Sequence, residues 1–277
     1  MNNNDAALVN DYMNNFSKEV EGWFFPIDML LFALLNEWQQ TVSVQGNIAE
    51  IGVYKGKSLI LLALLAREGE TIYAMDLFED DLLPAAKNAV SRFVPNKKQE
   101  QILYFKEDSA NYTLDYLREN FPTPLRFLHI DAGHEHHEVL HTLTLLSPLV
   151  TDAGVIMMDD YQDREFPGVG SAVLEFCYGD KRSNFVPFLV GANKMYLANP
   201  YIAKQIQKYL LQHNLLLDKC RLTRTHDDPV LIALSKLPQL SDKLIRQLNH
   251  YDLSTIDTAK IDFLAKKASV LGQQKIS

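Results

Sequence analysis

The feature that most constrains the fold of this chain is the alternation of short apolar runs with longer segments of helical periodicity. Strand-length apolar runs that end at or beside a polar or acidic residue occur at residues 48–51, 71–76, 101–105, 125–131 and 155–159. Segments of helical length separate these runs, at residues 57–67, 82–93, 112–120 and 135–150. Strands that alternate with crossover helices form a mostly parallel sheet with helices on both of its faces.

Two more strand-like runs follow this alternation. Residues 185–190 and 194–197 are joined by Gly191-Ala192-Asn193, a connection short enough for a hairpin. The sequence therefore predicts an α/β fold, a Rossmann-like doubly wound sheet of mostly parallel strands closed by an antiparallel hairpin. Helical additions are expected at both ends, and residues 230–234 are a candidate for one more strand.

Composition limits the partners of the chain. With 27 basic and 35 acidic residues the net charge is −8, and no basic run is long enough to neutralise a nucleic-acid backbone. The longest apolar stretch is far too short for a membrane span, and the first residues lack a secretory-leader pattern. Two cysteines suit a reducing compartment. We expect a cytoplasmic protein without nucleic-acid or membrane partners, and leave open whether it is a homo-oligomer.

A glycine-containing loop follows the first predicted strand and opens the next helix, where open α/β sheets bind ligands. It reads Glu50-Ile51-Gly52-Val53-Tyr54-Lys55-Gly56-Lys57-Ser58. A phosphate-binding P-loop needs four residues between its glycines, and this loop has three. The G-x-G-x-x-G spacing of a dinucleotide site is also absent. A nucleotide-binding hydrolase is therefore an alternative and not the first interpretation.

Acidic residues after the next two strands favour a third kind of ligand. Asp76 ends the second predicted strand 20 residues after Gly56, where a carboxylate can accept both ribose hydroxyls of an adenosine. Asp108 and Ser109 follow the third strand, at the expected height of an adenine ring. The alternative, that Gly52 and Gly56 only make a tight turn, leaves these acids without a role.

Together these residues resemble the class I S-adenosylmethionine-dependent methyltransferases. In that family an E-x-G-x-x-x-G-x-S loop, an acid ending strand two and an Asp-Ser pair after strand three surround the cofactor. The resemblance implies the following cofactor-binding residues: Glu50, Gly52, Tyr54, Gly56, Ser58, Asp76, Asp108 and Ser109. The expected division of the chain is an N-terminal helical cap or lid at 1–45, an S-adenosylmethionine-binding methyltransferase domain at 46–200 and a C-terminal extension at 201–277. We expect this extension to pack on the same domain, because no internal repeat or low-complexity linker precedes it.

Three carboxylates end the fourth and fifth predicted strands. Asp131 and the Asp159-Asp160 pair are about one β-α-β unit apart, which places them side by side at the carboxyl edge of adjacent strands. Converging carboxylates repel each other unless a cation or proton intervenes, and oxygen ligands suit Mg²⁺ or Mn²⁺ better than zinc. The sequence therefore predicts a metal site of Asp131, Asp159 and Asp160. The alternative is that the pair only caps the following loop.

Three segments narrow the resemblance: Ile130-Asp131-Ala132-Gly133-His134, Met158-Asp159-Asp160-Tyr161 and Pro167-Gly168-Val169. Over residues 21–197 they look like the bacterial metal-dependent O-methyltransferases of the macrocin and mycinamicin sugar-modifying type. In those enzymes a D-x-x-H segment supplies a metal-bound aspartate and a histidine base, which implies His134 as the base. Several relatives have D-G-D or D-G-S where this chain has Asp131-Ala132-Gly133, so no base is available at position 133. The last 80 or so residues lie outside the resemblance, and the acceptor does not carry over.

A second histidine pattern points to different chemistry. Residues His137-Glu138-Val139-Leu140-His141 satisfy H-E-x-x-H, the helix signature of zinc proteases. On a helix that begins near Glu135, however, both histidines lie opposite the apolar stripe, as surface histidines of a crossover helix do. A zinc hydrolase is therefore an alternative interpretation only.

The combined expectation is an enzyme that transfers a methyl group from S-adenosylmethionine to a hydroxyl of a small molecule, a sugar or natural-product scaffold, with Mg²⁺ or Mn²⁺. The alternatives are a nucleotide-binding or zinc hydrolase and a non-catalytic S-adenosylmethionine-binding module. Trp23, Phe24 and Phe25 are expected to belong to the core, with a lid over the acceptor as the alternative.

Overall fold

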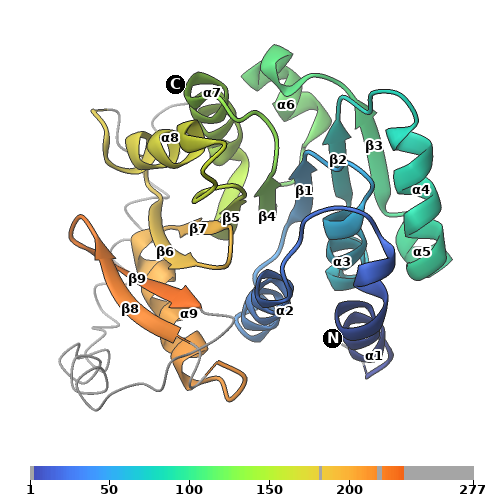
Figure 1. The fold of residues 1–277 in the computed structure, drawn as a ribbon, viewed down its shortest axis with the longest axis horizontal. Coiled ribbons are helices and arrows are strands. Elements are labelled where there is room, and N and C mark those ends of the chain that lie inside the picture. The colour runs from blue at the N-terminus through green and yellow to red at the C-terminus, as the bar shows by residue number, and fades with distance from the viewer. Residues whose placement is uncertain (1–2, 181–182, 217–219, 234–277) are drawn as a thin grey trace. The chain divides into compact units, whose positions relative to one another are not determined.

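A nine-stranded sheet organises the computed structural model, which describes residues 3–180, 183–216 and 220–233 (Figure 1). In chain order the strands are β1 Asn47–Ile51, β2 Ile72–Asp76, β3 Ile102–Lys106, β4 Leu125–Ile130, β5 Val150–Met158, β6 Val186–Val190, β7 Met195–Ala198, β8 Cys220–Thr225 and β9 Asp228–Ala233. The helices are α1 Asn3–Asp11, α2 Pro26–Thr41, α3 Lys57–Leu65, α4 Leu82–Phe93, α5 Asn96–Gln99, α6 Leu114–Asn120, α7 His136–Leu146, α8 Pro167–Tyr178 and α9 Pro200–Gln212. Among these described residues no helix is both long and apolar enough to cross a membrane.

The strand order is β3-β2-β1-β4-β5-β7-β6-β9-β8. Strands β1 to β5 pair in parallel, whereas β7 runs antiparallel to both β5 and β6. The sheet therefore confirms the predicted doubly wound fold closed by an antiparallel hairpin. Because the parallel strands all end at one edge, the loops that follow them lie together there.

The C-terminal part extends the sheet further than the sequence indicated. Strand β9 pairs in parallel with β6, and β8 pairs antiparallel with β9. Only β9 was expected, because β8 reads Cys-Arg-Leu-Thr-Arg-Thr and its two apolar residues give too weak a strand pattern. Helix α9 also packs against this part of the sheet. That residues 201–277 pack as a whole on the same domain remains a prediction, since 234–277 lie outside the described residues.

Helices cover both faces of the sheet (Figure 1). Helices α2, α3, α4 and α9 bury apolar side chains against one face, and α6, α7 and α8 against the other. Successive strand residues point to opposite faces, so in β1 Ile48 joins the first core and Ala49 the second. All residues of β1 and β4 are buried, which explains why these strands lack an alternating polar pattern.

The segment between α1 and α2 is hydrogen-bonded to the glycine loop. The Tyr12 hydroxyl donates to the Lys57 carbonyl oxygen at 2.7 Å. The Tyr54 hydroxyl donates to Glu21 Oε1 at 2.7 Å, and the Lys55 ammonium pairs with Glu21 Oε2 at 2.5 Å. The N-terminal segment is therefore positioned by the same loop that the sequence assigns to a ligand; its role as a cap or lid stays a prediction.

The aromatic residues of this segment divide between core and surface. Phe24 is buried against Phe32, with ring centroids 5.0 Å apart. Trp23 and Phe25 are 80% and 45% exposed. The expectation that all three belong to the core therefore fits Phe24 alone, because adjacent residues of an extended segment point in opposite directions.

Candidate active site

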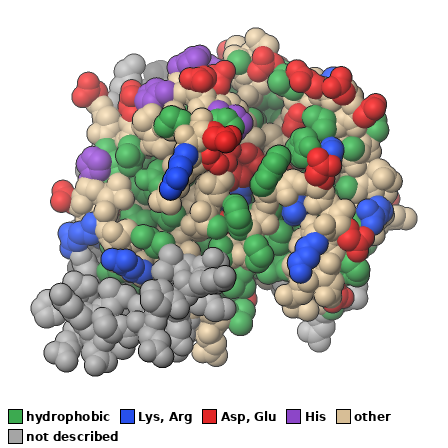
Figure 2. All heavy atoms as spheres, in the orientation of Figure 1, with side chains coloured by type: hydrophobic (Ala, Val, Ile, Leu, Met, Phe, Trp, Pro, Cys, Tyr) green, Lys and Arg blue, Asp and Glu red, His purple; other side chains and the backbone are tan. Residues whose placement is uncertain are grey.

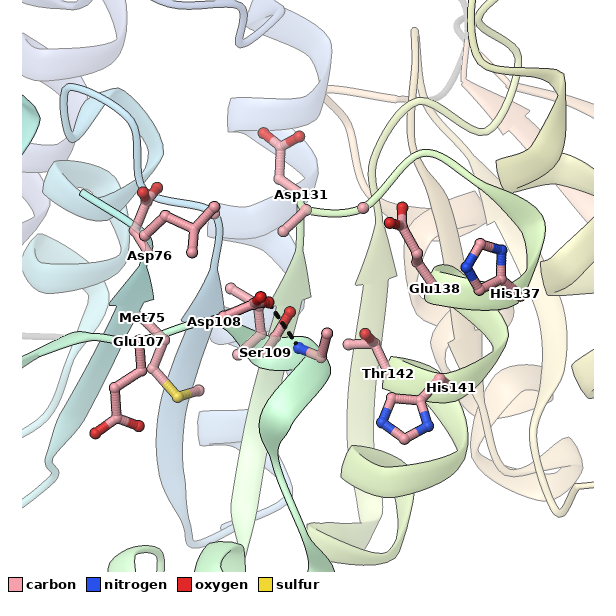
Figure 3. A pocket seen from close by; sticks show the side chains of 16 residues that line it. Met75, Asp76, Glu107, Asp108, Ser109, Asp131, His137, Glu138, His141 and Thr142 are labelled. Atoms are coloured by element: carbon pink, nitrogen blue, oxygen red, sulfur yellow. Dashed lines mark hydrogen bonds between the residues drawn. The ribbon is translucent and has the colours of Figure 1, made fainter. Parts of the chain in front are cut away.

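Two cavities open at the carboxyl ends of the parallel strands. The first cavity, about 610 Å³, is lined by the ends of β1, β2 and β4, the 107–110 segment after β3 and one side of α7 (Figure 3). The second cavity, about 790 Å³, is lined by residues 21–25, the glycine loop, the end of β5 and residues 162–166. Both contain Gly52, Asp76 and Asp131 in their walls. Each has the size of a small-molecule site, and the two are neighbours.

Gly52 is required at the boundary of the two cavities. Its φ is +88°, and a Cβ built there would lie 1.9 Å from the Asp131 carbonyl oxygen. No side chain can be accommodated, so β1 and β4 approach closely only because this residue is glycine. Gly56, with a φ of +84°, is the N-cap residue before α3 and lines neither cavity.

Asp76 ends β2 and binds the backbone of the glycine loop. Its Oδ2 accepts hydrogen bonds from the amides of Val53 and Tyr54 at 2.6 and 2.9 Å, and Oδ1 accepts from Phe78 at 2.7 Å. A carboxylate offers about four acceptor positions, so roughly one remains for a ribose hydroxyl. Asp76 therefore faces the first cavity and also holds the glycine loop in place. The sequence did not indicate this second, structural role.

Other expected cofactor residues lie in different cavities. Asp108 and Ser109 line the first cavity, where Asp108 Oδ1 accepts from the Ala110 amide at 2.9 Å and caps the turn Ser109–Asn111 (Figure 3). Tyr54 and Ser58 line the second cavity instead. Tyr54 has a φ of +48°, which is uncommon for a residue other than glycine and indicates local strain at this site.

Glu50, which the sequence also assigns to the cofactor, lines neither cavity. It is fully buried, and its Oε1 lies 2.8 Å from Nδ1 of His129. The strand register explains this position, because Glu50 of β1 pairs with His129 of β4 and both side chains point to the α2 face of the sheet. In this structure Glu50 therefore contacts His129 of the neighbouring strand and faces neither cavity.

Lys194 is buried next to the Glu50–His129 pair and links it to Asp159. The Lys194 ammonium lies 3.0 Å from His129 Nε2, donates to Asp159 Oδ2, and sits 5.2 Å from the centroid of the Phe24 ring. Burial acts to lower the pKa of Lys194, but the carboxylates of Asp159 and Asp131 outweigh it and raise the pKa. Lys194 is therefore a fixed positive charge behind the carboxylates.

The three predicted metal carboxylates do converge, and all of them line the second cavity. Burial and then the neighbouring Asp159 raise the pKa of both Asp131 and Asp160, well above the ordinary range in the case of Asp131. Burial would also raise the pKa of Asp159, but Lys194 and His129 lower it. Asp159 thus has a compensating cation in the protein, whereas Asp131 and Asp160 lack one of comparable strength.

This imbalance is what a divalent cation would correct. Two groups of the described side chains bring three potential ligand atoms within reach of one ion: His129 with Asp131 and Asp159, and Asp131 with His134 and Asp160. In the first group, His129 and Asp159 already contact the Lys194 ammonium. The carboxylate-rich set with raised pKa values fits a hard cation such as Mg²⁺ or Mn²⁺, most directly on the side of Asp131 and Asp160.

His134 lies beside these carboxylates in the second cavity. Its Nε2 is 3.1 Å from Asp160 Oδ2, and its ring stacks on Phe166 with centroids 3.9 Å apart and planes inclined by 18°. Gly168, at the start of α8, permits this packing, since a Cβ there would lie 2.7 Å from the His134 carbonyl oxygen. The Pro167-Gly168 pair therefore brings α8 against the backbone that carries His134.

The H-E-x-x-H segment begins α7. His137 and His141 are exposed, as expected, and both line the first cavity (Figure 3). Neither belongs to the two groups of potential metal ligands found among the described residues. The zinc-protease interpretation therefore has no third ligand in the described part of the chain.

Sequence reasoning gave no role to Arg164, Asn193 and the supporting Lys194. It offered Trp23 and Phe25 as a lid over the acceptor only as the alternative to core residues. Asn193 donates from Nδ2 to Asp160 Oδ1 at 2.6 Å. The short hairpin connection was the only available signal, because a loop between β6 and β7 must return to the end of β5.

Comparison with known proteins identifies the fold. A family model described as a methyltransferase domain matches residues 49–161. The structure of the O-methyltransferase NovP is similar at a TM-score of 0.51 and 18% identity, covering 70% of this chain and 99% of that one. An O-methyltransferase from Bacillus cereus in complex with SAH gives a TM-score of 0.50 and 15% identity, covering 69% of this chain and 89% of that one. No curated protein matches the sequence.

The strand order, the closing hairpin and the family match agree with each other. They confirm the fold that the resemblance to class I methyltransferases implies. Residues 49–161 of this chain form a methyltransferase domain of the class I fold.

Proposed function

We propose that this protein transfers a methyl group from S-adenosylmethionine to a hydroxyl of a small molecule, a sugar or natural-product scaffold, with the help of Mg²⁺ or Mn²⁺. One observation carries the proposal: two neighbouring cavities share Gly52, Asp76 and Asp131, and only the second contains Asp160 and His134. The first cavity suits the methyl donor, and the second suits an acceptor beside a cation.

The first cavity has the features that the cofactor requires. Asp76, Asp108 and Ser109 supply polar groups, whereas Ile51 and Met75 supply apolar surface. The side-chain-free wall at Gly52 permits close approach to the second cavity. S-adenosylmethionine supplies an electrophilic methyl group when it is bound, and these residues would align it with an acceptor oxygen.

In the second cavity the chain itself would position and deprotonate the acceptor. Asp131, Asp159 and Asp160 would hold the divalent ion, which when bound lowers the pKa of a hydroxyl. Lys194 fixes Asp159, and Asn193 fixes Asp160. His134 would accept the hydroxyl proton on its ring, which Phe166 and Asp160 hold in place.

Calorimetry with S-adenosylmethionine, ATP and Mn²⁺ on one preparation tests the proposal. We expect S-adenosylmethionine and Mn²⁺ to bind and ATP not to bind. Asp160→Asn should weaken Mn²⁺ binding by about 10- to 100-fold with little change in cofactor affinity. Asp152→Asn, an exposed carboxylate of β5 outside both cavities, is the matched control. Binding of ATP alone would favour the hydrolase, and unchanged Mn²⁺ affinity in Asp160→Asn would remove the metal from the proposal.

Catalysis requires a second measurement. Release of S-adenosylhomocysteine on addition of hydroxyl acceptors should stop after treatment with EDTA and return with Mg²⁺. Tight cofactor binding without turnover on any acceptor would indicate the non-catalytic binding module instead. Full turnover after exhaustive chelation would contradict metal dependence while leaving methyl transfer intact.

A further inference from the structure

The mouth of the second cavity carries exposed aromatic side chains. Trp23 and Phe25 are 80% and 45% exposed, and the Trp23 ring centroid is 6.2 Å from that of Tyr54. Phe166 lines the same cavity and stacks on His134. Exposed aromatic rings grouped at a cavity mark a surface that binds a ligand, because they offer large flat areas with little loss of side-chain freedom.

The same cavity is strongly acidic. Its lining includes seven carboxylates: Glu21, Asp76, Asp131, Asp159, Asp160, Asp163 and Glu165. The lining cations are Lys57 and Arg164. The Lys57 ammonium donates to the Gly22 carbonyl oxygen at 2.8 Å, and burial lowers its pKa. Acidic and hydrophobic side chains also gather near the centre of the face shown in Figure 2.

Some of these carboxylates already have partners. Glu21 pairs with Lys55, and Asp131, Asp159 and Asp160 are the proposed cation ligands, of which Asp159 also pairs with Lys194. At the rim, Arg164 stands between Asp163 and Glu165 in the sequence, so the 163–165 segment has a net negative charge. This rim charge persists when a cation occupies the inner carboxylates, and it would repel an anionic acceptor.

We propose that the acceptor is a ring-bearing molecule without negative charge, either uncharged or cationic, which stacks on Trp23 and Phe25. The acidic rim disfavours phosphorylated, nucleotide-linked and carboxylated acceptors. The inference rests on the proposed function in one respect: the second cavity is taken as the acceptor site.

Three phenyl glycosides of similar size and different charge test this inference: phenyl β-D-glucopyranoside, its 2-amino-2-deoxy analogue and phenyl β-D-glucuronide. The chain has two tryptophans, Trp23 at the cavity and the buried Trp38, so [¹⁵N]tryptophan labelling gives one reporter and one internal control. Titrations are followed by NMR with S-adenosylhomocysteine and Mg²⁺ present, and Trp23→Phe assigns the two indole signals.

We expect the neutral and amino glycosides to shift the Trp23 signal and to bind at least about tenfold more tightly than the glucuronide. The double variant Asp163→Lys/Glu165→Lys should remove or reverse this order. Asp115→Lys/Glu119→Lys adds the same charge on exposed positions of α6, outside both cavities, and should leave the order unchanged.

Equal or tighter binding of the glucuronide would overturn the inference. So would an order of affinities that stays the same in Asp163→Lys/Glu165→Lys. Failure of all three probes to shift Trp23 would also overturn it, because stacking would then be absent. The proposed function is tested by a separate measurement, the formation of S-adenosylhomocysteine. Turnover that prefers the glucuronide would retain methyl transfer and reject the acceptor class, whereas the expected charge order without turnover on any acceptor would do the opposite.

Discussion

The two cavities share a wall but are built from different parts of the sequence. The first cavity takes most of its lining from the ends of β1 and β2 and the segments after β3 and β4, and the rest from one side of α7. The second adds residues 21–25, the 162–166 loop and the Ala192-Asn193 connection, which meet only in the folded chain. The proposed donor cavity is thus encoded mainly at strand ends, and the proposed acceptor cavity depends on tertiary structure. Variants that affect one cavity and spare the other test this division.

The largest expected effect belongs to the second cavity alone. His134→Ala should lower turnover by about 10²- to 10⁴-fold, the usual contribution of a general base. Affinity for S-adenosylmethionine, measured by calorimetry, should stay nearly constant because His134 does not line the first cavity.

The neighbouring His136 provides the control for this prediction. His136 contacts Ser171 and Glu175 and lines neither cavity, so His136→Ala should retain turnover. A wild-type rate in His134→Ala would show that another group takes the proton. A parallel loss of cofactor affinity would show that the two cavities are not separable.

The second prediction concerns the charge behind the second cavity. Lys194→Met leaves Asp159 and His129 buried without their cation, and breaking a buried ion pair costs about 3–5 kcal/mol. Chemical denaturation should show a loss of this size in the free energy of unfolding. Adding Asp159→Asn should recover a large part of it, since the unpaired charge is then removed. If the double variant is less stable than Lys194→Met, the ion pair is not the source of the effect.

Lys194 also shows why part of the site was beyond sequence reasoning. The strand ends, Gly52, Asp76 and the three carboxylates were predicted because each lies at a fixed place in a β-α repeat. Lys194 opens the predicted strand-like run 194–197 and has no fixed place in such a repeat, and its burial depends on how β7 pairs with β5. Glu50 was assigned to the cofactor because it lies at the end of a strand. The sequence pattern does not determine which face of the sheet its side chain points to, and the structure buries it beside His129.

The third prediction belongs to the first cavity and the shared wall. Asp76→Ala removes the acceptor of three backbone amides and one ribose contact, at roughly 1–3 kcal/mol for each polar group left unpaired and buried. Because the loop amides regain water, only the ribose contact is counted, and we expect about 1–3 kcal/mol of lost S-adenosylmethionine binding by calorimetry. Glu79→Ala, an exposed acid three residues later that lines neither cavity, should have no effect. Unchanged affinity in Asp76→Ala would remove this residue from the cofactor site.

The smallest effect is expected at the histidines of the H-E-x-x-H segment. His137 and His141 line the first cavity but are exposed to water and make none of the cavity's internal hydrogen bonds among the described residues. Surface substitutions usually change free energies by no more than about 0.5 kcal/mol, so His137→Ala and His141→Ala should alter S-adenosylmethionine affinity by about two- to threefold at most. Elemental analysis should find no zinc in the purified wild type. Bound zinc that disappears in either variant, together with lost activity, would reverse the ranking of His134 over these two residues and would move the chemistry from the second cavity to the first.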